Sequence, residues 1–425
     1  MTPYAQMQRS QLQTEYTSVQ AEFERWKAQD LHLNMARGKP CSVQLDMVSD
    51  IFSLLQKPED FIDHGIDVRN YGELSGIPSA KALFADILGC RPEQVFVGGN
   101  ASLQLMYDTI SKAYTHGLLE SPQPWSQLPC VKWLCPAPGY DRHFKISESF
   151  GMQMISIPLT EDGPDMDIVE AYLSDPTVKG MWCVPKYSNP DGYVYSPETV
   201  RRIAAMKPAA PDFLLMWDNA YCIHEFDGDF VPFQDILSLC QEAGRPNMVL
   251  EFASTSKITF PGAGIACMAG SEENLRYLSS LIGIQTIGFD KINQLRHARY
   301  LQDKEHTLQL MRRHAAILKP KFDIVCRILE EEIVPLGIAS FRRPTGGYFI
   351  SCNTLPGLAK RTLALCKEAG VVMTPAGATY PYGYEVKDSN IRIAPTYPPV
   401  AELEKAMEVF CVCLKLAALE QLLGQ

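Results

Sequence analysis

The sequence lacks the features that mark membrane, secreted and nucleic-acid-binding proteins. No apolar stretch approaches the roughly 20 residues that a membrane helix needs, and the N-terminus, MTPYAQMQRSQLQTEY, is polar with no apolar core. No run of Lys and Arg stands out, and the net charge is −10, so phosphate backbones are not expected as partners. There is no internal repeat and no low-complexity segment. These absences predict a globular protein of the cytoplasm, with no membrane or nucleic-acid partner.

The 13 cysteines lack the spacing of a metal or redox site. None forms a CxxC pair, and the only close pair is Cys411 and Cys413. We therefore expect free thiols in a reducing compartment, most of them buried as small apolar residues. No metal site is expected.

Short apolar runs alternate with helical patterns after about residue 75. Alternation of this kind predicts an α/β fold, with a mostly parallel, seven-stranded sheet between helices. Ser196 and Pro197 have the residue types of a helix cap and first turn, so a helix is expected over 196–206. Functional sites in such sheets lie at the carboxyl ends of the strands. The seven expected strands are 94–97, 131–134, 154–158, 180–184, 213–217, 248–252 and 264–269.

Outside this region the pattern is different. Residues 8–30 have the apolar spacing of one amphipathic helix, and a long helix over 284–315 is expected to bridge two domains. Strands are expected over 338–342, 348–352 and 390–395, among long helical stretches, as in a smaller α+β domain. The expected domains are an N-terminal helix and arm joining the small domain (1–45), a large domain (46–310) and a small C-terminal domain (311–425).

Two strand ends carry residues that suit covalent and acid–base chemistry. Lys257 follows the strand 248–252 within Ser254-Thr-Ser-Lys257; it could be a solvated lysine, or a nucleophile if burial lowers its pKa. Asp218 follows the strand 213–217. It could cap a turn, or it could face a pyridine nitrogen and keep that nitrogen protonated. Tyr221, three residues on, could then reach the phenolic oxygen of the same ring.

Three further motifs could complete such a site. Asn189, in Ser-Asn-Pro-Asp-Gly, marks either a simple turn or an amide donor to the phenolic oxygen. The segment Gly98–Ser102 follows a strand and opens a helix, which suits phosphate. Arg392, inside an apolar strand, could form an internal salt bridge or could bind a carboxylate through its planar fork.

The order phosphate loop, Asn, Asp-x-x-Tyr, Lys, Arg resembles the fold-type I enzymes that use pyridoxal 5′-phosphate (PLP), specifically the class I/II aminotransferases. The resemblance covers about residues 30 to 420. Four segments are similar to the bacterial aspartate aminotransferase-like branch, often labelled MocR-family aminotransferase. They are 33–40 (LNMARGKP), 70–76 (NYGELSG), 139–144 (GYDRHF) and 254–264 (STSKITFPGAG).

The resemblance implies a role for each motif. Lys257 would be the Schiff-base lysine, with Asp218 and Tyr221 as its catalytic partners, and Gly38, Asn189 and Arg392 would bind substrate. Tyr71 would reach the phosphate of the neighbouring subunit's cofactor, so a homodimer with shared active sites is expected. The implied cofactor-binding residues are Tyr71, Asn100, Ala101, Ser102, Tyr140 (stacked on the ring), Asn189, Asp218, Tyr221, Ser254, Ser256, Lys257 and Lys291.

One position departs from the family pattern. The family usually has an arginine seven or eight residues after the lysine, where this chain has Gly264 and Ile265. A buried phosphate dianion needs a cation, so we expect Lys291 or Arg296 to supply one.

The resemblance implies transfer of an amino group between an amino acid, best taken as aspartate or another dicarboxylic one, and a 2-oxo acid such as 2-oxoglutarate. A distal carboxylate needs a second cation, for which Arg37, Lys39 and Arg296 are candidates. Two other functions fit the same motifs. One is a PLP-dependent lyase, and the other is a PLP-binding regulatory module without turnover.

Overall fold

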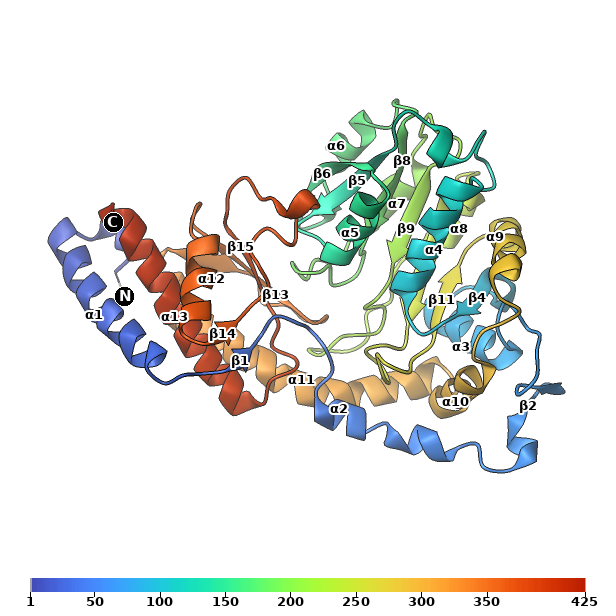
Figure 1. Ribbon diagram of the computed structural model, residues 1–425, viewed down its shortest axis with the longest axis horizontal. Helices are drawn as coiled ribbons and strands as arrows, with labels where there is room; N and C mark the ends of the chain where they lie inside the picture. The colour runs from blue at the N-terminus through green and yellow to red at the C-terminus, as the bar shows by residue number, and fades with distance from the viewer. Residues whose placement is uncertain (1, 425) are drawn as a thin grey trace.

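The computed structural model describes residues 2–424, which form two lobes joined by a long helix (Figure 1). The larger lobe is built on one sheet with the strand order β4-β11-β10-β9-β8-β5-β6-β7. Strands β10, β9, β8, β5 and β6 run parallel, and β11 is antiparallel to both of its neighbours. The strands are β4 (Val95–Gly98), β5 (Lys132–Ala137), β6 (Gln153–Thr160), β7 (Gly163–Pro164), β8 (Val178–Cys183), β9 (Leu214–Asp218), β10 (Val249–Ser254) and β11 (Ala266–Ala269).

All seven strands expected in the large sheet are present, and the α/β fold class is confirmed. The two-residue β7 adds an eighth strand at the sheet edge. Along β9, Leu214 and Met216 pack on one face while Leu215 and Trp217 pack on the other. This alternation follows from strand geometry, and both faces are apolar because helices cover both.

Helices cover the two faces of the sheet in two groups. Residues of α3 (Pro78–Leu88), α7 (Pro197–Ala205) and α8 (Ile236–Glu242) join the core on one face, and residues of α4 (Ser102–Thr115), α5 (Asp141–Ser149) and α9 (Glu272–Gln285) join the core on the other. The Thr199 amide donates to Ser196 Oγ at 3.2 Å, so Ser196 caps α7 as expected. The large lobe also holds α6 (Met166–Ala171) and the two-stranded β2 (Ile62–Asp63) and β3 (Ile66–Asp67).

The expected bridge over 284–315 is wrong in its bounds, because the chain breaks there into two helices. Helix α10 (Lys291–Leu301) ends at Gln302, whose φ of 59° is left-handed. Helix α11 (Lys304–Glu332) then begins after Asp303, which caps it by accepting from the His306 amide at 2.8 Å. It is α11 that runs from the large lobe to the small one (Figure 1).

The smaller lobe packs around α13 (Val400–Leu423), which lies against α1 (Arg9–Lys27), α11 and α12 (Ala359–Glu368). Its sheet has the order β12-β13-β15, with β12 (Ala339–Phe341), β13 (Ile350–Thr354) and β15 (Asn390–Ile393). The N-terminal arm reaches this lobe through β1 (Leu33–Asn34), which pairs with β14 (Val371–Val372), and then enters α2 (Ser42–Asp46). The domain boundaries at 45 and 310 stay predictions.

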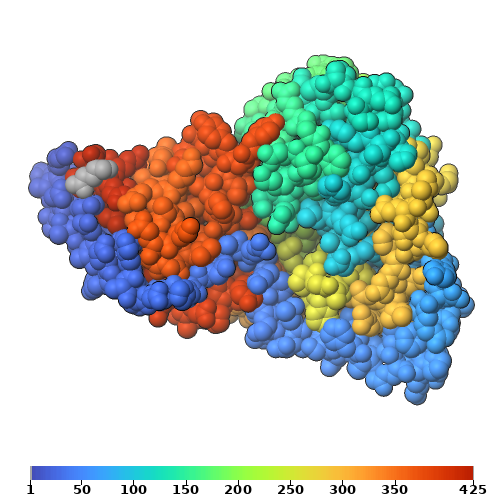
Figure 2. Space-filling model, viewed as in Figure 1, coloured from blue at the N-terminus to red at the C-terminus, as the bar shows by residue number. Residues whose placement is uncertain are grey.

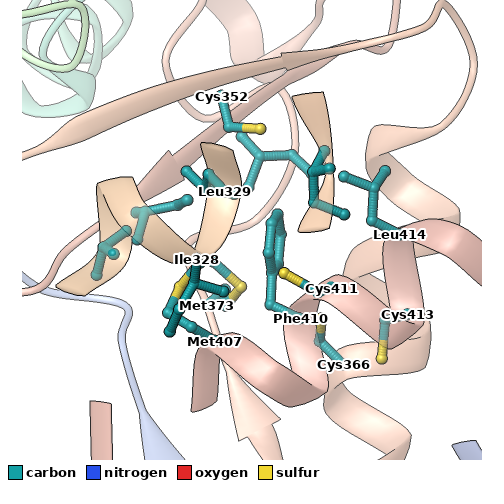
Figure 3. Packing of buried hydrophobic residues seen from close by; sticks show 14 of the residues in the cluster. Ile328, Leu329, Cys352, Cys366, Met373, Met407, Phe410, Cys411, Cys413 and Leu414 are labelled. Atoms are coloured by element: carbon teal, nitrogen blue, oxygen red, sulfur yellow. The ribbon is translucent and has the colours of Figure 1, made fainter. Parts of the chain in front are cut away.

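The small-lobe core includes several cysteine and methionine side chains. Cys352, Cys366, Cys411 and Cys413 lie around Phe410 in the cluster drawn in Figure 3. All 13 cysteines are free thiols and ten are buried, as the sequence predicted. Over residues 2–424, no helix combines the length and apolar character needed to cross a membrane.

Candidate active site

Lys257 lies at the carboxyl edge of the large sheet, three residues after β10 ends. Its Nζ lies 4.9 Å from the ring centroid of Tyr221 and 5.7 Å from that of Tyr348. Burial lowers the pKa of Lys257, and the carboxylate of Asp218 opposes that change. A lysine with a lowered pKa is more often a neutral amine, which is the form that attacks a carbonyl carbon.

Asp218 ends β9 and is held by a histidine that sequence reasoning missed. His143 Nε2 donates to Asp218 Oδ2 at 3.0 Å, and the histidine ring stacks on Trp182 with centroids 4.4 Å apart. The second oxygen, Asp218 Oδ1, is buried with no hydrogen-bond partner among residues 2–424. A buried carboxylate oxygen normally has a donor, and a protonated pyridine nitrogen would be one.

The turn after Lys257 is fixed by two further histidines that the sequence did not single out. Thr259 Oγ1 donates to His297 Nε2 at 2.8 Å, and His314 Nε2 donates to the Ile258 carbonyl at 3.0 Å. Burial lowers the pKa of each histidine to about 4. Both rings are therefore neutral at pH 7, which lets one ring nitrogen donate while the other accepts.

A single pocket gathers most of the predicted catalytic and substrate-binding residues. It is lined by Gly38, Tyr140, Val184, Asn189, Asp218, Ala220, Tyr221, Lys257 and Phe349. The ring of Phe349 packs directly against Gly38, because a Cβ at position 38 would lie 2.6 Å from Phe349 Cζ. Phe349, which the sequence reasoning also missed, therefore closes the pocket against the N-terminal arm. The stacking of Tyr140 on a cofactor ring stays a prediction.

Arg392 joins the small lobe to this pocket. Its Nη1 donates to Asn189 Oδ1 at 3.2 Å and to Asp141 Oδ1 at 2.9 Å. Its guanidinium lies 4.7 Å from the ring centroid of Phe349 and contacts Thr374 Oγ1 at 3.4 Å. The ion pair with Asp141 confirms one of the two expectations for Arg392. Arg392 also lines a cavity beside the pocket, where it can meet a carboxylate. The Asn189 amide nitrogen has no protein acceptor among residues 2–424, so it can donate to a ligand.

The predicted phosphate-binding segments come together across β11. Gly98 and Ser254 both pair with Ala266, from the strands on either side of it, and the Ala266 amide donates to the Gly99 carbonyl at 2.9 Å. Ala101 is the cap of α4 and Ser102 its first residue, with Asn100 just before them. Ser254 Oγ donates to Ser256 Oγ at 3.1 Å. A helix N-terminus beside two hydroxyls fits a phosphate.

Three predicted residues lie away from this pocket. Tyr71 is 83% exposed in the loop before α3. Lys291 is buried at the start of α10, beside Gly288. Arg296 donates to Asn293 Oδ1 at 2.8 Å, and its guanidinium lies 5.4 Å from the ring centroid of Phe52. The roles of Tyr71, Lys291 and Arg296 at the phosphate stay predictions.

The buried amine of Lys257 and the free oxygen of Asp218 in one pocket fit a bound PLP. The comparisons with known proteins agree. Residues 7–425 match the family model described as aspartate amino-transferase, and the chain belongs to that family, whose members use PLP. The expected enzyme class and cofactor are therefore confirmed.

Two relatives are similar over nearly their whole length. A putative aminotransferase of Mycolicibacterium smegmatis is 46% identical over 98% of both chains. The aspartate aminotransferase of Corynebacterium glutamicum is 46% identical over 95% of this chain and 94% of its own. The crystal structure of an aspartate transaminase from the latter organism superposes with a TM-score of 0.95, covering 97% of each chain.

A more distant structure shares the fold. LysN, an α-aminoadipate aminotransferase of Thermus thermophilus, is 20% identical and has a TM-score of 0.72 over 96% of this chain and 98% of its own. That structure was determined in complex with N-(5′-phosphopyridoxyl)-L-leucine.

Proposed function

We propose that the chain is a cytoplasmic, homodimeric aspartate aminotransferase that moves an amino group from a dicarboxylic amino acid to a 2-oxo acid such as 2-oxoglutarate. The observation that carries the proposal is the free oxygen of Asp218 in the same pocket as the amine of Lys257. The 46% identity to the aspartate aminotransferase of Corynebacterium glutamicum supports the choice of substrate.

PLP, when bound, supplies an aldehyde and an electron-accepting ring. The residues of this chain would set up that chemistry. Asp218 Oδ1 would hold a proton at the pyridine nitrogen, while His143 keeps the carboxylate in place through Oδ2. Asn189 and Tyr221 would donate to the phenolic oxygen. Ser102, Ser254 and Ser256, with the N-terminus of α4, would hold the phosphate.

Lys257 and Arg392 would handle the substrate. Arg392 would bind the α-carboxylate, with the Gly38 backbone beside it. Lys257 Nζ would move the proton of the substrate Cα. Its lowered pKa favours this role, because a general base must be neutral to accept a proton.

The proposed dimer rests on Tyr71. Tyr71 is 83% exposed, and in the proposed dimer this side chain would reach the phosphate of the partner's cofactor. Exposed Ile284 and Ile287 on the same lobe would be covered by the partner. Sedimentation equilibrium should therefore give twice the chain mass, and a monomer that transaminates would contradict the shared site.

The experiment that tests the function is amino-acid turnover without a keto acid. An aminotransferase should convert one equivalent of aspartate per site and then stop until 2-oxoglutarate is added. Continuous release of ammonia or pyruvate would instead indicate a lyase. No conversion with any amino acid would indicate a PLP-binding module without turnover.

A further inference from the structure

A second cavity, of about 590 Å³, adjoins the pocket of Lys257. Gly38, Tyr140 and Phe349 line both, so a molecule bound at the Lys257 amine can extend into the second cavity. The charged side chains that line this second cavity are Arg37, Asp141, Arg142 and Arg392.

Two of these arginines are free to bind a ligand. Arg392 is already paired with Asp141. Within residues 2–424, Arg37 and Arg142 form no ion pair and no side-chain hydrogen bond, although the cavity is lined by both. Both arginines lie next in sequence to residues of the site. Arg37 precedes Gly38, which lines the Lys257 pocket, and Arg142 follows Asp141, which pairs with Arg392.

The other cations considered for a distal carboxylate lie elsewhere. Lys39 Nζ stacks on the ring of Tyr397, 3.8 Å from its centroid. Arg296 is held by Asn293 and lies over Phe52, and neither Lys39 nor Arg296 lines this cavity. Of the three candidates, Arg37 lines this cavity, and Arg142 lies there with it.

The charge of the cavity matches a dianion. Three guanidinium groups and one carboxylate leave a balance of two positive charges. Arg37 and Arg142 are exposed to solvent at the cavity, and a dicarboxylate can form charge-assisted hydrogen bonds both to Arg392 and to these two arginines. The positive charge of Arg142 also acts on Tyr140, which lines the Lys257 pocket. Burial raises the pKa of Tyr140 to about 12, and the positive charges of Arg142 and Arg392 oppose that rise.

We propose that Arg142 and Arg37 form the subsite for the distal carboxylate of the substrate, while Arg392 holds the α-carboxylate. This inference rests on the proposed function and assigns the residues that make it specific for dicarboxylic acids. Arg142 and Arg37 are specificity-determining residues, and they take no part in moving the proton at Cα.

The test is the binding of two unreactive probes to the full-length holoenzyme. Maleate carries two carboxylates and acetate carries one, and neither has an amine to react. Binding is followed by calorimetry and by the absorbance of the bound cofactor. For Arg142→Gln, Arg37→Gln and the double variant, we expect the dissociation constant of maleate to rise roughly 10- to 100-fold, as for the loss of charge-assisted hydrogen bonds. The dissociation constant of acetate should not change.

Arg25→Gln is the matched control, because Arg25 is an exposed arginine on α1 of the other lobe. It should leave both constants at the wild-type value. Unchanged maleate binding in the double variant would overturn the proposal, and so would an equal loss for maleate and acetate. Failure of the proposed function would be seen separately, as an absence of transamination in the wild-type enzyme.

Discussion

Acid should weaken the turn that carries Lys257, because two neutral histidines hold it. His297 accepts from Thr259 and His314 donates to Ile258. Each histidine has its pKa lowered from 6.5 to about 4, which is worth roughly 3 kcal/mol per residue. The unfolded chain takes up these protons below pH 6.5, while the folded chain resists them until about pH 4. Stability is therefore present above pH 6.5 and is lost as the pH falls toward 4.

The perturbation is the double variant His297→Gln, His314→Gln, since glutamine can keep one hydrogen bond toward the turn but does not titrate. Urea midpoints of the holoenzyme should be measured at pH 7.5 and at pH 4.5. At pH 7.5 the variant should be less stable by about 1–2 kcal/mol, from imperfect hydrogen bonds. When the pH is lowered from 7.5 to 4.5, the double variant should lose less free energy of unfolding than the wild type.

His306→Gln is the control for this experiment. His306 is exposed near the start of α11, and its side chain pairs with Asp303. This variant should lose as much stability in acid as the wild type. A double variant that lost as much stability in acid as the wild type would contradict this role of the two histidines.

Three further outcomes follow from the site. Asp218→Asn should lower the transamination rate roughly 100- to 1,000-fold in stopped-flow half-reactions; a loss below tenfold would contradict its role. Burial raises the pKa of Glu251 to about 8, so the contribution of Glu251 to stability should fall as the pH rises from 4.5 to 8, and Glu251→Gln should remove that contribution from urea titrations. Gly264→Ala should destabilise the holoenzyme by about 1–3 kcal/mol, because its Cβ would lie 2.7 Å from the Phe260 carbonyl; unchanged thermal unfolding would contradict this.

The clash at Gly264 bears on the missing arginine of the family. A Cβ there would also lie 2.9 Å from Thr255 Oγ1, so the turn has no room for a side chain. A cation at the phosphate site, from Lys291 or Arg296, stays a prediction.

The large sheet was predictable because each strand is a short apolar run bounded by Gly, Pro or polar residues. Asn189, Asp218 and Lys257 were predictable as a group, since parallel strands bring their carboxyl ends to one edge. The family resemblance supplied their roles. The break between α10 and α11 was missed because no Gly or Pro marks it, although Asp303 is a good helix cap.

The residues that support the site were not predictable. His143 lies 75 positions from Asp218, and Asp141 lies 251 positions from Arg392. No local pattern encodes such contacts, because they depend on how α5 packs beside β9 and on how the small lobe meets the large one. The sequence showed that Arg392 needed a partner, but only the fold identifies Asp141.

Reduction of the purified holoenzyme with borohydride tests the central claim most directly. The structure places one amine, that of Lys257, in the pocket with Asp218 and Tyr221. Peptide mapping after reduction should therefore recover the phosphopyridoxyl group on the peptide that contains Lys257, and Lys257→Ala should abolish the label. Recovery of the group on any other lysine, or labelling that survives in Lys257→Ala, would contradict the account.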